Sequence, residues 1–468
     1  MTVSNEMRGR GRTGPSLLLT AFLWLSGTSM VVGAATLPSQ PNILFILVDD
    51  LGYGDLRITG ARDVQTPHMD RLFSGGLVFN HFYANSSVCS PSRAAFLTGR
   101  YPDQVGVPGV IRQEKKRSWG HLSERTVLLP ERLRLVGYQT AIIGKWHLGL
   151  ESPNIPNDRG FDFFKGFLGG MMHDYWDHNE DGEYWMRENR MEITPEKIHS
   201  TELFTQWATH YLTDRDTDKP FFLFLSYMAP HAPIQPPQEW IDRVVKRRLP
   251  LDDKRIRYVA FIEHLDHAIG RVVAALEDQA LLENTLIVIT SDNGGALSYG
   301  SSNGALRGEK TMMYEGGIKV PCAFHWQGTL DPGKRTDAMA MIMDLFPTFC
   351  ELAGVEATGS IAGRSLVEVM ASPDQPQQDR TLFWVRRDDR RTGGQAHYAA
   401  RHQNFKLVQN TPFEPYQLFD LNEDPRESSP IADTRHPMYR KLQRELIQHI
   451  RRSGAVPWQK PALPGNED

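Results

Sequence analysis

The stretch NILFILVDD, residues 42–50, joins an apolar run directly to two carboxylates, Asp49 and Asp50. A short continuous apolar run is typical of a strand that is buried on both faces, and such strands are usual in parallel sheets. In open α/β sheets, ligands bind beyond the carboxyl ends of the strands. The stretch therefore predicts a covered parallel sheet and places two acidic side chains at its ligand-binding edge.

Four more apolar runs follow the same pattern, with helical patterns between them. The runs lie at 77–83, 138–144, 220–227 and 285–290. Helices are predicted at 66–76, 126–137 and 256–279, the last of which has apolar residues three and four positions apart. Strands that alternate with helices predict an α/β fold whose mostly parallel sheet is covered by helices on both faces.

The composition of the chain changes near residue 355. Turn-rich segments at 354–363 and 372–380 are typical of linkers. Short strand patterns follow, and 436–454 has the pattern of a terminal helix. We therefore expect a catalytic domain over 37–360 and a small C-terminal α+β domain over 375–460.

The first 36 residues differ from the rest of the chain. A basic start, the apolar run LLLTAFLWL and the small residues of VVGAAT follow one another in the order of a secretory signal peptide. The apolar run is short for a bilayer span, although an uncleaved membrane anchor is the alternative. No second run of membrane-spanning length follows, so we expect no stable span in the mature chain. We expect a signal peptide over 1–36 and a periplasmic or extracellular protein, or a secretory or lysosomal one in a eukaryote. The net charge of −4 gives no indication of a nucleic-acid surface.

A second acidic cluster ends another predicted strand. In TLIVITSDNGG, residues 285–295, Asp292 and Asn293 directly follow the apolar run. Together with Asp49 and Asp50 they offer three carboxylates and one amide carbonyl, which suit Ca²⁺ or Mg²⁺ better than zinc. Helix capping or turn formation is the alternative for each cluster, because Asp and Asn favour both.

Cys89 lies in SSVCSPSRAAFLTGR, residues 86–100. Pro91 resembles the first residue of a helix, which would put Cys89 near the N-cap, where a lowered pKa could produce a thiolate nucleophile. Cysteine-dependent phosphatases, however, have five residues between Cys and Arg, whereas three separate Cys89 from Arg93, and Ala95 stands where that arginine would be. A packed, unreactive cysteine is the other alternative.

Four cationic or titratable groups follow predicted strands or lie in glycine-rich segments. They are Lys145 and His147 in GKWHLG, His231 in MAPHAP and Lys310 in LRGEKTMMYEGG. Each alone is most simply a surface or core residue, but together with an acidic cation site they could converge on a tetrahedral anion. That combination favours hydrolysis of a sulfate or phosphate ester.

Several long motifs of the chain resemble those of one family, the type I sulfatases. CSPSRAAFLTGR closely resembles the family signature Cys-x-Pro-Ser-Arg followed by Leu-Thr-Gly-Arg, and GKWHLG is similar to the second signature. The family order also recurs in ILVDDLGYGD, APHAP, SDNGG, LRGEKTMMYEGG and YQLFDLNEDPRE. The resemblance covers roughly residues 40–450. It implies the alkaline-phosphatase-like fold, with a large mixed sheet and a small C-terminal antiparallel sheet.

The resemblance also implies site residues and cofactors. A maturation enzyme would oxidise Cys89 to formylglycine, whose hydrate would be the nucleophile. Arg93 would hold this hydrate, Lys145 and His147 would orient and deprotonate it, and His231 and Lys310 would bind sulfate oxygens. The Ca²⁺ ligands would be Asp49, Asp50, Asp292, Asn293 and the modified Cys89.

The implied activity is calcium-dependent hydrolysis of sulfate esters, either aryl sulfates or sulfated carbohydrates. A hydrated aldehyde offers two hydroxyls, one to attack sulfur and one that His147 can deprotonate so that sulfate leaves by C–O cleavage. A phosphate or phosphonate ester hydrolase on the same fold is the alternative enzyme, and a secreted binding protein that is never matured is the alternative outside enzymes.

Four further features remain open from the sequence. The segment 169–185, rich in His, Asp, Trp and Tyr, lines the mouth of the site or is a solvent-exposed insertion. Cys322 and Cys350 read as small core residues, and a disulfide between them is possible. The sequon at Asn85 lies so near Cys89 that we expect it not to be glycosylated. Arg159 stands where members of the family often carry another polar residue, so the polarity of the site at that position stays open.

Overall fold

The computed structural model describes residues 37–112, 121–180, 182–387 and 395–454. The expected signal peptide over 1–36 lies outside these residues. Ten strands form the large sheet: β1 (Asn42–Val48), β2 (Leu77–Tyr83), β3 (Gln139–Lys145), β4 (Phe163–Phe167), β7 (Met186–Glu188), β8 (Met191–Glu192), β9 (Phe221–Ser226), β10 (Thr285–Ser291), β11 (Cys322–His325) and β12 (Lys334–Met341). A separate short hairpin contains β5 (Asn179–Glu180) and β6 (Glu183–Tyr184).

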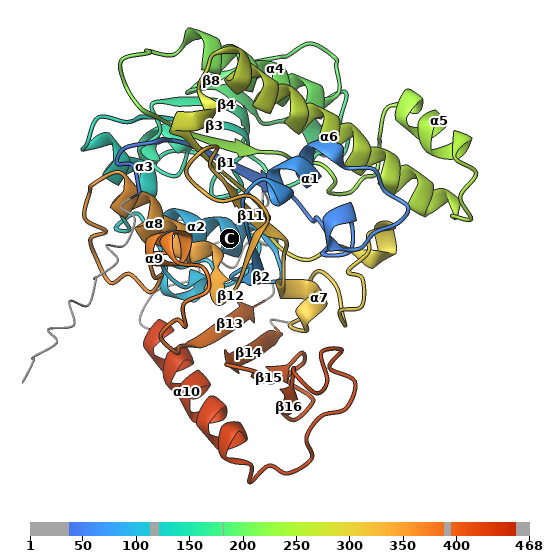
Figure 1. Ribbon diagram of the computed structural model, residues 1–468, viewed down its shortest axis with the longest axis vertical. Coiled ribbons are helices and arrows are strands. Elements are labelled where there is room, and N and C mark those ends of the chain that lie inside the picture. The colour runs from blue at the N-terminus through green and yellow to red at the C-terminus, as the bar shows by residue number, and fades with distance from the viewer. Residues whose placement is uncertain (1–36, 113–120, 181, 388–394, 455–468) are drawn as a thin grey trace, which may run out of the picture. The chain divides into compact units, whose positions relative to one another are not determined.

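The strands of the large sheet follow the order β12-β2-β11-β10-β1-β9-β3-β4-β7-β8 (Figure 1). The central strands β10, β1, β9, β3 and β4 are parallel to their neighbours in this series, as are β12 and β2. Antiparallel pairing enters through β11 on one side and through β7 and β8 on the other. The sheet is therefore mixed and mostly parallel, which confirms the expected fold class.

Helices cover both faces of this sheet. They are α1 (Pro67–Ser74), α2 (Cys89–Thr98), α3 (Leu129–Arg134), α4 (Ser200–Asp214), α5 (Gln238–Lys246), α6 (Asp253–Asp278), α7 (Glu315–Ile318), α8 (Leu345–Leu352), α9 (Val367–Ala371) and α10 (Pro437–Ser453). Phe45 and Leu47 of β1 lie in one core with residues of α2, α3 and α8, whereas Leu44 and Ile46 lie in another with residues of α1, α4 and α6. Because successive side chains of a strand point to opposite faces, a strand covered on both is mostly apolar, as β1 is from Ile43 to Val48.

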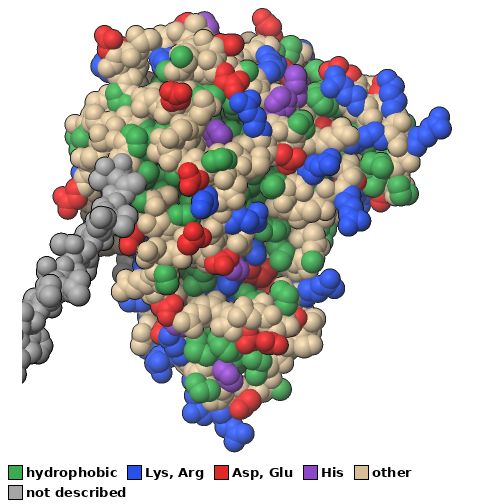
Figure 2. Space-filling view, viewed as in Figure 1, with side chains coloured by type: hydrophobic (Ala, Val, Ile, Leu, Met, Phe, Trp, Pro, Cys, Tyr) green, Lys and Arg blue, Asp and Glu red, His purple; other side chains and the backbone are tan. Residues whose placement is uncertain are grey.

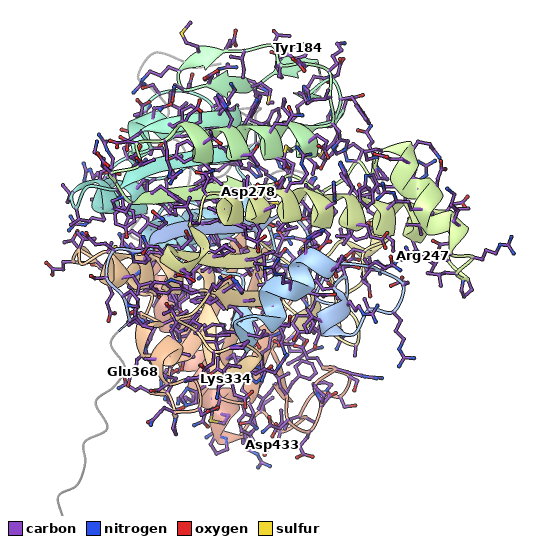
Figure 3. All side chains as sticks on the ribbon, turned by 45° about the horizontal axis from the view of Figure 1, so that its top comes forward. Tyr184, Arg247, Asp278, Lys334, Glu368 and Asp433 are labelled. Carbon is purple, nitrogen blue, oxygen red and sulfur yellow. The ribbon has the colours of Figure 1, made fainter. Side chains whose placement is uncertain are left out.

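The surface and the helical layer can be followed in two further views. Figure 3 labels Asp278, the last residue of α6, and Arg247, just after α5, and shows α6 lying along the strands. On the face drawn in Figure 2, Lys and Arg side chains lie among Asp and Glu over most of the surface. None of the described helices combines the length and the hydropathy that crossing a membrane requires.

The helix α2 begins two residues earlier than the sequence predicts. Cys89 is its first residue, Val88 is the N-cap, and Pro91 occupies the third position instead of the first. The first four N–H groups of a helix have no acceptor within it, so a proline here sacrifices no hydrogen bond. The helix ends at Gly99, whose φ of 63° is the left-handed conformation that glycine adopts without strain.

A small antiparallel sheet follows in the C-terminal part. Its strands are β13 (Thr381–Arg387), β14 (Ala396–His402), β15 (Phe405–Gln409) and β16 (Gln417–Asp420), and α10 packs against the first three. Its core is shared with the first part of the chain, because Trp384 and Leu442 lie in one cluster with Tyr83 and Ile318. Figure 1 shows this sheet and α10 below the large sheet, next to β12.

The two cysteines outside the motif are core residues, as the sequence predicts. Cys322 lies in β11 and Cys350 in α8, and both are buried as free thiols. The disulfide that the sequence left possible is therefore absent. Asn85 is also buried, and its Oδ1 accepts a hydrogen bond from the Met343 N–H, so the folded chain cannot present this sequon to solvent.

Candidate active site

Four neighbouring parallel strands deliver the candidate site residues to one edge of the large sheet. Asp49 and Asp292 directly follow β1 and β10, whose last residues are paired in register. Lys145 is the last residue of β3, and His231 lies a few residues beyond β9. Because the carboxyl ends of parallel strands meet at one edge, groups that are far apart in the sequence converge there.

The turn after β1 holds the two carboxylates in place. Asp50 has φ 66°, a left-handed conformation that Asp tolerates better than most residues. Its N–H lies 3.3 Å from Asp292 Oδ1, its carbonyl accepts from the Tyr258 hydroxyl at 3.1 Å, and the next N–H, of Leu51, donates to Ser291 Oγ at 3.0 Å. The turn is therefore tied to β10 and α6 at successive residues.

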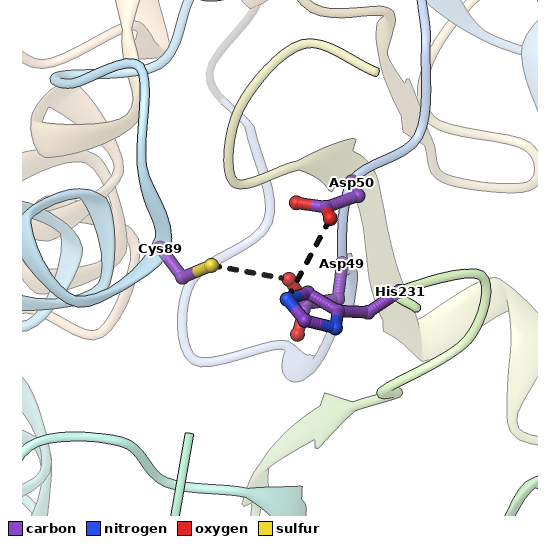
Figure 4. A group of neighbouring side chains, drawn as sticks. All are labelled: Asp49, Asp50, Cys89 and His231. Atoms are coloured by element: carbon purple, nitrogen blue, oxygen red, sulfur yellow. Dashed lines mark hydrogen bonds and ion pairs between the residues drawn. The ribbon is translucent and has the colours of Figure 1, made fainter. Parts of the chain in front are cut away.

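Cys89 lies at the start of α2 with its sulfur directed at the acidic pair (Figure 4). The side chain is 3% exposed, and Sγ lies 3.4 Å from Asp49 Oδ1. Burial raises the pKa of the Cys89 thiol, and the Asp49 carboxylate raises it further. The expected lowering by the helix start is thus reversed, and the sulfur is a neutral thiol instead of a thiolate.

Two buried cations, Lys145 and Arg93, and the partly exposed Lys310 compensate the carboxylates. Lys145 pairs with Asp49 Oδ2, Arg93 Nη2 lies 2.9 Å from Asp292 Oδ2, and Lys310 Nζ lies 2.7 Å from Asp50 Oδ2. Burial opposes ionisation of Asp49, but Lys145, His231, Arg93 and Lys310 together lower its pKa. Burial and the charge of Asp49 raise the pKa of Asp292, while Arg93 and Lys145 lower it.

The expected residues fall into two groups around a cavity of about 720 Å³. Those that line it are Asp50, Cys89, His147, His231 and Lys310. Those that lie behind the lining, with no exposed surface, are Asp49, Arg93, Lys145, Asp292 and Asn293. A second cavity of about 590 Å³, between β12, residues 373–380 and the small sheet, contains none of the expected residues, so the first is the candidate site.

Two of the four groups that could hold a metal ion here are carboxylates, which suit a hard divalent cation. Ligand atoms of Asp49, Asp50, Cys89 and His231 lie within 4.8 Å of one another. Asn293 donates from Nδ2 to Asp50 Oδ1 at 2.8 Å, while its buried Oδ1 has no hydrogen-bond partner within the described part of the chain. A buried carbonyl oxygen without a donor, next to several carboxylates, is the arrangement that a calcium ligand requires.

Arg93 lies behind the lining of the cavity, beside the second acidic cluster. Its guanidinium donates to Asp292 Oδ2, to the Lys145 carbonyl at 3.0 Å and to Ser226 Oγ at 2.6 Å, and it does not line the cavity. With its donors used in this way, Arg93 holds the carboxylates behind the cavity.

His147 has the geometry of a base. Its Nε2 lies 2.9 Å from the Ile111 carbonyl, which can only accept, so Nε2 carries the proton. Its Nδ1 is buried and has no hydrogen-bond partner among the described residues. Burial lowers the pKa of His147 well below its usual value, and Lys145 and Arg93 lower it further, so the ring is neutral near pH 7 with a free lone pair.

Gly170 makes room for this imidazole, which provides a first test. A Cβ on Gly170 would lie 2.3 Å from His147 Nε2, so Gly170→Ala must displace the ring. We expect kcat to fall by about 10²-fold, as a shift of about 1 Å in a catalytic group can produce. Steady-state kinetics of purified protein measure this. Gly454→Ala, whose Cβ would meet only ordinary contacts, is the control; equal kinetics of the two variants would contradict the assignment of His147.

The segment 169–185 contributes to the wall of the cavity. Gly170, Met171, His173 and Glu180 line it, so this segment is part of the site and not a separate insertion. The Tyr175 hydroxyl lies 2.7 Å from the His231 carbonyl and 3.0 Å from the Met228 carbonyl, and so it fixes the loop that carries His231. Arg159 lies elsewhere, bonded to Asn154 and to the Thr126 carbonyl.

Other lining residues were missed by the sequence reasoning. They are Arg112, Tyr299, Glu309 and Arg386, among others. Arg386 comes from β13 of the small sheet, and the only signal for it was a pair of arginines at the end of a predicted strand. Because strand ends of a second sheet cannot be placed from sequence, this contribution to the site was not predictable.

The chain matches two family models and many known proteins. Residues 41–355 match a family described as Sulfatase, and residues 308–455 match N-sulphoglucosamine sulphohydrolase, C-terminal. The chain is 32% identical to N-acetylgalactosamine-6-sulfatase of Canis lupus familiaris over 76% of its own length and 70% of that protein. It is 33% identical to arylsulfatase A of Bos taurus over 88% and 87% of the two chains.

Solved structures share the fold. One described as Ps i-CgsB in complex with k-i-k-neocarrahexaose superposes with a TM-score of 0.82 at 29% identity and covers 90% of this chain and 95% of that one. A phosphonate monoester hydrolase of Agrobacterium radiobacter superposes with a TM-score of 0.64 at 20% identity, covering 89% and 95%, which shows a common fold only.

Proposed function

The chain belongs to the sulfatase family, and from that premise we propose that it hydrolyses sulfate esters with Ca²⁺ and with a formylglycine made from Cys89. One observation carries the proposal: Cys89 is a neutral, buried thiol at the cavity, beside carboxylates and cations that suit an anionic ester. As sulfur it is a poor nucleophile here, because a thiol reacts as its thiolate. A maturation enzyme would therefore have to convert it.

Formylglycine would supply a hydrated aldehyde, and the residues of the chain would act around it. His147, with a free Nδ1, would accept the proton of a hydroxyl at position 89. Lys145 would orient that hydroxyl and compensate Asp49, with which it is paired. Arg93 would fix the carboxylates of Asp49 and Asp292 and, next to residue 89, would hold the hydrate.

Lys310 and His231 are the proposed sulfate-binding residues. Both line the cavity and both lie next to Asp50, Lys310 at 2.7 Å and His231 at 3.6 Å. Burial opposes the charge of Lys310, but the carboxylates of Asp50 and Asp49 raise its pKa, so it stays protonated. A fixed ammonium in a buried site stabilises the charge that develops on the ester oxygens.

Calcium would be held by the oxygens behind Cys89. We propose Asp49, Asp50, Asp292 and Asn293 as ligands, with the modified residue 89 completing the site. Calcium, when bound, would polarise the ester and add positive charge beside these carboxylates.

A sulfated carbohydrate is the proposed substrate class, with aryl sulfates as the second. The cavity of about 720 Å³ is large enough for a small sugar, and its wall combines charged and hydroxyl-bearing side chains. The names of the relatives N-acetylgalactosamine-6-sulfatase and arylsulfatase A support both classes.

We further propose that the protein is exported, with a signal peptide over 1–36, a catalytic domain over 37–360 and a small domain over 375–460. The leader pattern of the sequence supports the export. The large and small sheets described above support the division between domains.

Matched ester substrates test the function. We expect kcat/KM of the matured enzyme for an aryl sulfate to exceed that for the same aryl phosphate by at least about 10²-fold, or ~3 kcal/mol in the transition state. The two esters differ in charge and leave the same phenol, so the ratio reports the group that is transferred. A preference for the phosphate would favour the alternative, a phosphate or phosphonate ester hydrolase, whose fold this chain shares.

A further inference from the structure

The loop that carries Lys310 spans residues 306–315, the last of which is the first residue of α7, and it is anchored from two sides. On the side of the large sheet, the Lys310 N–H donates to the Gly295 carbonyl at 3.0 Å, and the Thr311 N–H donates to the Ser87 carbonyl at 2.8 Å. These two bonds place the loop beside the second acidic cluster and beside the segment before Cys89. They hold the loop at Lys310 and Thr311 but not at the residues that follow.

The small sheet anchors the remainder of the loop. Asn410 Oδ1 accepts from the Met313 N–H at 2.6 Å, and Gln417 Oε1 accepts from the Tyr314 hydroxyl at 3.1 Å. Glu427 Oε2 accepts from the Glu315 N–H at 2.6 Å. Three successive residues of the loop are therefore bonded to side chains from the C-terminal part of the chain.

A buried ionic cluster reinforces the end of the loop. Lys406 Nζ of β15 lies 2.9 Å from Glu315 Oε1 and 2.9 Å from Glu427 Oε1, and the Tyr83 hydroxyl donates to Glu315 Oε2 at 2.7 Å. Both carboxylates and the ammonium are buried. Breaking such a cluster leaves an uncompensated charge, so it holds the loop rigidly.

Arg386 reaches the loop at the residue next to Lys310. It lies near the end of β13, is 6% exposed, lines the cavity and donates from Nη1 to the Thr311 carbonyl. Thr311 has φ 81°, a conformation that costs a β-branched residue free energy and persists only where neighbours enforce it. The guanidinium therefore supports a strained turn that directs Lys310 towards Asp50.

We propose that Arg386 is a positioning residue for Lys310, and that the small sheet thereby takes part in building the active site. The proposal rests on the proposed role of Lys310 in binding the sulfate group. It assigns Arg386 no contact with substrate, so its effect on the reaction should pass through Lys310.

A double-mutant cycle tests this inference on the matured, calcium-loaded enzyme. Arg386→Met is expected to lower kcat/KM by about 10- to 100-fold, and Arg386→Lys, which keeps a donor for the Thr311 carbonyl, should retain most of the activity. In a Lys310→Ala background, Arg386→Met should change kcat/KM by less than about 2-fold, because the group that it positions is already absent. Arg440→Met, an exposed arginine of α10, is the control and should be unchanged.

Two results would overturn the inference. An Arg386→Met effect that multiplies with that of Lys310→Ala would mean that Arg386 acts on the substrate directly. Unchanged activity of folded Arg386→Met, verified by its thermal unfolding, would mean that the turn needs no support. Both measurements use the ester that the wild type hydrolyses best. A preference of the wild type for a phosphate ester would contradict the proposed function, but the coupling between Arg386 and Lys310 could still be measured with that ester.

Discussion

Cys89→Ala is expected to lower kcat by at least about 10⁴-fold, since the variant lacks any nucleophile and retains only binding and electrostatic stabilisation. Cys89→Ser should also be severely impaired. A serine hydroxyl can attack sulfur, but it lacks the second hydroxyl that allows sulfate to leave without a second attack on sulfur. Turnover should therefore stop after one event, with a sulfated protein detectable by mass.

Mass analysis of peptides from the purified enzyme complements the kinetics. In active enzyme, the peptide that contains Cys89 should be about 18 Da lighter than its thiol form, because sulfur and two hydrogens are exchanged for one oxygen. Cys350→Ala is the control and should keep its activity, since Cys350 is a free thiol in α8 that does not line the cavity. Full activity with an unmodified Cys89 thiol would refute the proposal.

Removal of calcium is the second change with a large expected effect. Dialysis against a calcium chelator should lower activity by about 10³-fold or more, because carboxylates and anionic ester would then share one site without the cation. Added Ca²⁺ should restore it more fully than Mg²⁺, which demands a tighter octahedral geometry than a site with several fixed carboxylates offers. Calcium should also raise the thermal unfolding temperature, because it binds only the folded chain.

A ligand variant makes this prediction specific. Asp49→Asn should lose bound calcium, measured as metal per chain after gel filtration, and should lose activity to a similar extent. Asp70→Asn is a matched control, because this half-buried carboxylate of α1 accepts a hydrogen bond from the Ile58 N–H and lies in another part of the fold. Retention of about one calcium per chain in Asp49→Asn would exclude Asp49 as a ligand.

Much of the fold follows from the character of the strands. The run at 42–48 became β1 because a strand covered on both faces is apolar over most of its length, and the same holds for β9 and β10, whose polar residues lie at their ends. The site followed from this, because the residues directly after such strands can only lie at the sheet edge. Strand ends and motifs therefore predicted which residues come together.

How deeply each site residue is buried was not predictable in the same way. The sequence gives no means to distinguish Lys310, which lines the cavity, from Lys145 and Arg93, which lie behind it. The distinction changes chemistry, because burial raises the pKa of the Cys89 thiol, whereas a helix start alone would lower it. Burial depends on how layers pack, and packing involves residues such as Arg386 whose partners are remote in the chain.

The core shared by the two sheets has a consequence for biosynthesis. Tyr83 and Ala84 at the end of β2 pack or bond with Trp384, and Tyr83 also meets Arg401. A chain emerging from the ribosome presents β2 early and these partners last. The end of β2 therefore lacks these partners until most of the protein has been synthesised. Truncation before β13 would leave the end of β2 permanently exposed. It would also remove the C-terminal side chains that bond to the Lys310 loop. The complete site therefore forms only after the small sheet has been synthesised.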